Sequence, residues 1–191
     1  MTNKNTDQIL VEKVQQGDKK AFDVLVLKYQ QKVANIVTRY IRDPVESLDV
    51  TQEAFIKAYR ALPNFRGDSA FYTWLYRIAI NTAKNYLVSQ SRRPPGTDVD
   101  AESAEQIDSG ERLKDRASPE SILLSDEIAT TERNAIEALP EELKTAITLR
   151  ELEGLSYEEI AEAMDCPIGT VRSRIFRARE AIDSQLAPLL S

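Results

Sequence analysis

Hydrophobic residues recur along most of the chain at steps of three and four positions, which is the period of an α-helix. The first long stripe of this kind runs from Phe22 to Tyr40. The same spacing predicts one helix from Pro44 to about Leu62 and another from about Ala70 to Ser91. We expect these helices to pack together as one all-α module that spans residues 1–93.

Capping residues support the expected helix starts. Asp18 is placed to cap the first helix, and Asp43 followed by Pro44 suits an N-cap and a first helical position. Pro63 and the segment after it end the second helix. On the inner face of that second helix we expect Phe55, Tyr59 and Leu62.

Residues 94–119 differ in kind from the segments on either side. They are rich in Pro, Gly, Ser and acidic residues and show no sustained apolar period. This composition predicts a flexible acidic linker that is extended or disordered when free. The linker is either a plain tether or a strand that threads a cationic channel in a partner.

A second helical module is expected over residues 120–191. Helical spacing returns in four segments, at about 120–138, 141–152, 156–164 and 170–187. The predicted fold class is therefore all-α, with two small helical domains joined by the linker, the second of which contains a helix-turn-helix.

The helix-turn-helix is the clearest motif in the chain. Ser156 and Glu159 form a capping box, and Asp165–Gly169 is the expected turn before a helix capped by Thr170. The apolar positions of that helix face inward, so its outer face carries Arg172, Ser173, Arg174, Phe176, Arg177 and Arg179. Such a face reads base edges in the major groove. The alternative is a surface helix whose basic residues only confer solubility.

Charge is distributed unevenly along the sequence. The net charge is −6, which by itself argues against a nucleic-acid partner. Between Ser69 and Thr97, however, there is no Asp or Glu, and the stretch combines cations with aromatic residues. Aromatic rings among cations suit single-stranded DNA, although most of these rings would serve equally well in a core.

Composition also excludes several classes of site. Histidine is absent, and the single cysteine, Cys166, allows neither an internal disulfide nor a cysteine-based zinc site. No nucleotide-binding glycine loop occurs, so we expect no enzyme, no cofactor, no metal and no small-molecule substrate. The chain has neither a membrane-spanning apolar run nor a secretory signal, which predicts a cytoplasmic protein.

Three segments together carry a family resemblance. Residues 49–62, 65–93 and 149–182 resemble regions two and four of the extracytoplasmic-function sigma factors, close to the envelope-stress sigma-E branch. The resemblance covers essentially the whole chain. One departure is Tyr59, where many members of that family have Trp.

The resemblance implies three sets of functional residues. The set that docks on the clamp helices of the largest polymerase subunit is Asp49, Gln52, Glu53, Phe55, Ile56, Tyr59 and Arg60. The set that melts or reads the −10 element is Lys57, Phe65, Trp74, Tyr76, Arg77 and Asn81, beside a loop at 64–71 that resembles a pocket for a flipped base. The set for the −35 element is Thr170, Arg172, Ser173, Phe176 and Arg177, on the helix that opens at Thr170, together with Arg150 from the helix at 141–152 as a phosphate contact.

The leading hypothesis is thus a sigma factor that binds core RNA polymerase and directs promoter-specific initiation, of envelope or extracytoplasmic stress genes. Its implied partners are the polymerase, promoter DNA in duplex and single-stranded form, and an anti-sigma factor anchored in the inner membrane. The alternative is a dimeric helix-turn-helix regulator that acts without polymerase. A nucleic-acid enzyme is disfavoured, because the chain lacks histidine, metal motifs and nucleotide loops.

Overall fold

The computed structural model describes residues 2–92 and 119–189. This part of the chain is helical, and the order of its elements is α1 (Thr2–Gln15), α2 (Lys19–Val37), α3 (Pro44–Ala61), η1 (Leu62–Asn64), α4 (Phe71–Ser91), α5 (Pro119–Glu137), α6 (Glu141–Glu151), α7 (Tyr157–Met164), α8 (Ile168–Leu186) and η2 (Ala187–Leu189). The predicted all-α fold class is confirmed. The predicted linker at 94–119 lies, except for its last residue, outside the described residues.

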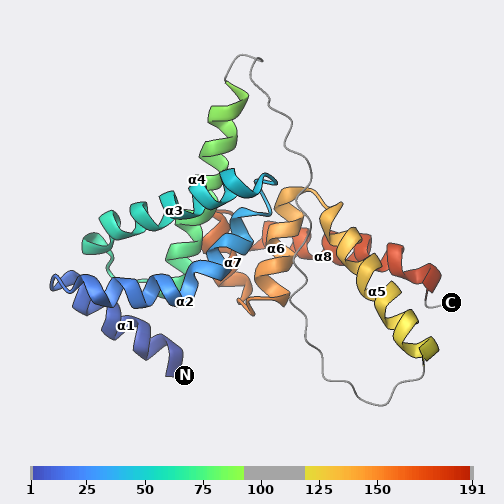
Figure 1. Cartoon of the computed structure of the whole chain (residues 1–191), viewed down its shortest axis with the longest axis horizontal. Coiled ribbons are helices and arrows are strands. Elements are labelled where there is room, and N and C mark those ends of the chain that lie inside the picture. The colour runs from blue at the N-terminus through green and yellow to red at the C-terminus, as the bar shows by residue number, and fades with distance from the viewer. Residues whose placement is uncertain (1, 93–118, 190–191) are drawn as a thin grey trace.

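Helices α1 to α4 form the N-terminal group, at the left and top of Figure 1. The predicted caps are present: the side chain of Asp18 accepts from the first-turn amides of α2, and Asp43 does the same for α3. Helix α4 packs against both α2 and α3, and its C-terminal end projects beyond them in Figure 1. Helix α1, which the apolar spacing did not predict, packs along α2.

The inner face of α3 differs from the prediction at one position. Phe55 and Leu62 are buried as expected, but Tyr59 is 38% exposed even though its ring lies 4.9 Å from that of Phe22. Tyr59 therefore belongs to the edge of the stripe, where one side of a ring can touch the core while the hydroxyl end faces solvent.

Helices α5 to α8 form the C-terminal group. The capping box at the start of α7 is present, with Ser156 and Glu159 each bonded to the backbone of the other. Helix α8 packs on α5, α6 and α7, so this helix is supported on several sides.

The predicted start of α8 was wrong. Thr170 does not cap this helix, because Pro167 is the N-cap residue and the Thr170 amide already donates to the Pro167 carbonyl at 2.9 Å. The chain reverses at Asp165, whose φ of 51° is left-handed and ends α7. A reversal at this residue needs only a very short turn, so Gly169 is inside the first turn of α8 instead of in the connection.

The two groups of helices pack directly on each other. Helix α7 lies against α4, and their buried side chains belong to one continuous hydrophobic cluster that includes Leu75, Ala79, Leu155 and Ile160. The sequence did not predict this contact, which joins residues about eighty positions apart.

Candidate nucleic-acid interface

The outer face of α8 presents the predicted base-reading residues to solvent. Arg172, Ser173 and Arg177 are exposed, and Phe176 is 68% exposed. Their apolar neighbours on the same helix, Val171, Ile175 and Ala178, are buried. An exposed phenyl ring between arginines is costly in water, and it is suited to contact a thymine methyl group.

Side chains beside this face have partners within the protein. Arg150 donates to the Leu155 carbonyl at 2.8 Å, and its guanidinium lies 5.1 Å from the centre of the Tyr157 ring. Arg174 donates to the Cys166 sulfur at 3.2 Å and also pairs with Glu142. Thr170 is half-buried in the first turn of α8. The structure thus orients Arg150 at the end of α6 rather than leaving it freely mobile.

Three of the predicted −10 residues, Phe65, Trp74 and Arg77, lie together around the start of α4. The Trp74 ring lies 4.9 Å from that of Phe65 and 5.8 Å from that of Phe71. A pocket of about 350 Å³ opens there, lined by Asn64, Phe65, Arg66, Asp68, Ser69, Trp74, Arg77 and Glu162. The aromatic cluster and the loop before α4 are therefore adjacent, as the sequence suggested.

Not all of that set is accessible. Asn81 is exposed on α4, but Tyr76 is 1% exposed, with its hydroxyl 3.1 Å from Glu153. Lys57 lies on α3 and forms an ion pair with Glu53 at 2.7 Å. In this arrangement Tyr76 is a core residue, which is the alternative that the sequence left open for the rings.

The predicted docking face on α3 is largely open. Asp49, Gln52, Glu53 and Arg60 are exposed with Ile56 among them, whereas Phe55 is buried beneath. The structure adds Val45 and Leu48, two exposed apolar residues on the same helix that sequence reasoning missed. Their i, i+3 spacing places them together on a face outside the buried stripe. This spacing was the signal in the sequence that could have identified them.

Comparison with known proteins shows which family the chain belongs to. Residues 25–93 match the family described as Sigma-70 region 2, and residues 132–182 match Sigma-70, region 4. The ECF RNA polymerase sigma-E factor of Escherichia coli is 64% identical over 190 residues, which cover 100% of this chain and 99% of that protein. The chain belongs to the ECF sigma factor family.

Other relatives agree with this assignment. The RNA polymerase sigma-H factor of Pseudomonas aeruginosa is 65% identical, with 100% of this chain and 98% of that protein covered. Among solved structures, the sigma factor RpoE in complex with the anti-sigma factor NepR from Bartonella quintana has a TM-score of 0.67 at 22% identity, covering 88% of this chain and 98% of that one. As a sigma factor, the protein acts in promoter-directed transcription initiation, which removes the alternative of a dimeric regulator that works without polymerase.

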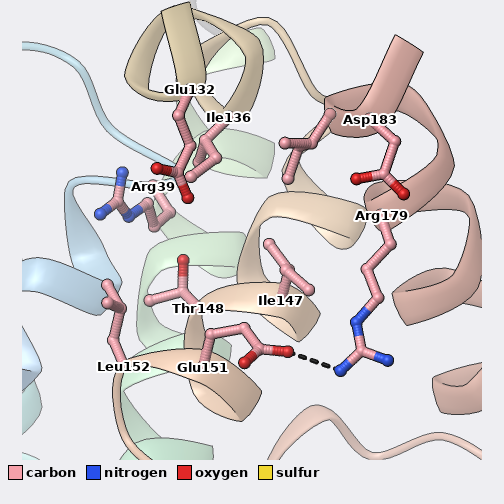
Figure 2. Close-up of a pocket in the computed structure, with 10 residues that line it drawn as sticks. Arg39, Glu132, Ile136, Ile147, Thr148, Glu151, Leu152, Arg179 and Asp183 are labelled. Carbon is pink, nitrogen blue, oxygen red and sulfur yellow. Dashed lines mark hydrogen bonds and ion pairs between the residues drawn. The ribbon is translucent and has the colours of Figure 1, made fainter. Parts of the chain in front are cut away.

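A further pocket of this sigma factor is lined by none of the residues assigned to the −10 element, the −35 element or polymerase. Its volume is about 390 Å³. In Figure 2, Ile136 lies beside Glu132 at the top of the pocket, and Ile147 lies above the ion pair of 2.6 Å between Arg179 and Glu151. Arg39, which follows α2, lines the same pocket together with residues of α5, α6 and α8. Within residues 2–92 and 119–189, no group of acidic or cysteine side chains is arranged to hold a metal ion, and no helix is long and apolar enough to cross a membrane.

Four buried or half-buried tyrosines lie where the sigma factor's two groups of helices meet. Burial raises the pKa of Tyr40 to about 12, and the nearby carboxylates of Glu142 and Glu141 act in the same direction. Burial likewise raises the pKa of Tyr72 to about 12, helped by its hydrogen bond to Glu159. Burial raises the pKa of Tyr29 and Tyr76 as well, with Asp7 and Glu153 as the respective carboxylate neighbours.

Alkaline pH should therefore destabilise the fold. An unfolded tyrosine loses its proton near pH 10, and folded Tyr40 near 12, so the stabilisation from its neutral form is complete below pH 10 and is lost as the pH rises to 12. For this buried residue alone the loss is about 3 kcal/mol. Urea unfolding followed between these pH values measures it. Tyr40→Phe should reduce the pH slope of the unfolding free energy by about one proton, and an unchanged slope would contradict the assignment.

Proposed function

We propose that this sigma factor reads promoters with two separate surfaces, region 2 within residues 1–93 and region 4 within residues 120–191, joined by the linker at 94–119. Each surface would bind a different form of DNA: the −35 element as duplex and the −10 element as a melted strand. The matched family descriptions, at 25–93 and 132–182, support this division.

The −35 contact is assigned to the outer face of α8. The single observation that carries the proposal is this face, with three exposed polar residues around a 68% exposed Phe176 on a firmly packed helix. The proposed contacts are Arg150, Thr170, Arg172, Ser173, Phe176 and Arg177. Arg150 would serve as a phosphate contact. One guanidinium nitrogen donates a hydrogen bond to the Leu155 carbonyl, and this bond fixes the orientation of the remaining N–H donors.

The −10 contact is assigned to the aromatic cluster and to the exposed side of α4. The proposed residues are Lys57, Phe65, Trp74, Tyr76, Arg77 and Asn81. Phe65 and Trp74 stand at a pocket wide enough for an unstacked base, with Arg77 at its edge to meet a phosphate. Tyr76 takes part only if α4 is uncovered, since it is buried here.

Core polymerase would dock on α3. The proposed residues are Asp49, Gln52, Glu53, Phe55, Ile56, Tyr59 and Arg60, and Val45 and Leu48 extend their apolar part. An exposed apolar stripe bordered by charge suits a helical partner such as the clamp helices of the largest subunit. Phe55 would support this face from beneath.

Our proposal for the regulation of this protein starts from one related complex. A Bartonella sigma factor of the same fold is solved with an anti-sigma factor, and we propose such a partner here, anchored in the inner membrane, in the control of envelope-stress genes. The protein would act in the cytoplasm and without a cofactor. It would catalyse no reaction of its own, and the absence of histidine supports this last point.

Sequencing the RNA 5′ ends made by core polymerase with and without this protein tests the proposal. Adding the protein should create a new set of start sites that share two upstream elements. Adding Phe176→Ala in its place should keep the fold but weaken initiation at those sites. Start sites that do not change when the wild-type protein is added would contradict the proposal.

A further inference from the structure

The contact between the two groups of helices has a one-sided charge pattern. In four ion pairs that cross it, the N-terminal group supplies the cation and the C-terminal group supplies the carboxylate. These pairs are Lys32–Glu153 at 2.6 Å, Arg39–Glu137 at 2.8 Å, Lys84–Glu142 at 2.9 Å and Arg77–Asp165 at 3.3 Å. Cations that meet carboxylate oxygens here could equally meet the phosphate oxygens of a nucleic-acid backbone.

The same contact covers part of the set of residues that we assign to the −10 element, although Asn81 on α4 stays exposed. Tyr76 is buried, with its hydroxyl against Glu153, and Tyr72 donates to Glu159 of α7 at 2.5 Å. Glu162 of α7 stands at the pocket that contains Trp74 and Arg77. While α7 occupies this space, a single strand of DNA cannot stack on Tyr76, and Arg77 is already paired with Asp165. The phosphates of a strand in the pocket would also meet Glu162.

The other two functional surfaces are not covered. The outer face of α8, represented by Arg172 and Phe176, is exposed, and so is the face of α3 that includes Gln52 and Ile56. The contact therefore blocks only one of the three proposed binding surfaces.

We propose that this contact is autoinhibitory: carboxylates of the C-terminal helices, above all Glu153, occupy the positions that DNA phosphates take on the −10 face, and the protein must open between α4 and α7 to bind a melted strand. The inference rests on the proposed function in assigning that strand to α4. It also orders the events, because polymerase can dock on α3 of the closed protein, whereas single-stranded DNA binds only after opening.

A substitution of Glu153 can weaken the contact between the two groups of helices without disturbing the folding of either group. Both of its partners, Lys32 and Tyr76, belong to the N-terminal group, so a charge reversal there removes no contact within the C-terminal helices. Glu159 is unsuitable because it caps α7. Glu180 is the matched control, since it is exposed on α8 and the same reversal changes the net charge equally.

The test uses the full chain with Glu153→Lys or Glu180→Lys and two readouts. Trp74 is the sole tryptophan, so acrylamide quenching of its fluorescence reports opening without any DNA. Anisotropy of a labelled single-stranded oligo(dT) of about twelve nucleotides reports access to the face. If the closed form is about nine-tenths populated, Glu153→Lys should increase quenching and raise the oligonucleotide affinity about tenfold. Glu180→Lys should leave quenching unchanged and alter affinity only slightly.

A charge swap completes the test. Lys32→Glu added to Glu153→Lys should restore the low quenching and the low affinity, because the pair is rebuilt with reversed sign. Equal effects of the two single reversals, or an opened protein that binds the oligonucleotide no better, would overturn the inference. Failure of the proposed function would appear elsewhere, as unchanged RNA start sites with core polymerase.

Discussion

Replacing Arg172 and Arg177 together by glutamate should lower initiation at promoters that depend on the −35 element by at least about a hundredfold. Each arginine is expected to contribute about 1–3 kcal/mol through base-edge or phosphate contacts. Glutamate removes that contribution and adds repulsion from the DNA backbone. The combined effect should therefore exceed that of two alanine substitutions.

The double substitution should leave the fold intact. Both arginines are exposed, and within the described ranges neither forms an ion pair, whereas Arg174 and Arg179 on the same helix do. The buried side of α8, formed by Val171, Ile175 and Ala178, is unchanged. A thermal melt should accordingly show nearly the midpoint of the wild type.

Run-off transcription with core polymerase measures the effect. The matched control is Lys19→Glu with Arg133→Glu, two exposed positions on α2 and α5 that change the net charge by the same amount. The control should retain most of the activity. If the α8 variant kept more than half of it, or if both variants lost activity equally, the assignment of α8 to the −35 element would be wrong.

Local signals in the sequence predicted most of the individual helices. The periodicity of apolar residues predicted α2 to α8 to within a few positions, because each helix buries one stripe. The caps at Asp18, Asp43 and Ser156 were correct, since a cap depends on side chains within three residues of it. Thr170 failed because a left-handed Asp165 shortens the turn, and nothing in residue type requires Asp to adopt that conformation.

Interactions between distant segments could not be predicted in this way. Tyr76 was equally consistent with a reader of DNA and with a core ring, and its burial depends on Glu153, far along the chain. The ion pairs between α4 and the C-terminal helices join Lys84 to Glu142 and Arg77 to Asp165. Patterns along one helix give the direction of a face, but they do not identify which other helix will cover it.

Replacing Leu149 by alanine should cost the fold about 2–5 kcal/mol, which is a large share of the stability of a small domain. Leu149 lies fully buried on α6, the helix that packs against both α7 and α8. Removing its branched end leaves a cavity beneath the recognition helix, and the loss grows with the volume that the neighbours cannot refill.

Leu152 provides the control for this loss within the same short segment. It is 68% exposed, so Leu152→Ala removes the same atoms from water rather than from the core and should change the unfolding free energy by no more than about 0.5 kcal/mol. Urea unfolding followed by circular dichroism compares the two variants. Similar losses from both would mean that α6 does not support α8 through Leu149. A large loss from Leu149 alone would show that the helix-turn-helix depends on the packing beneath it as well as on the arginines that it presents.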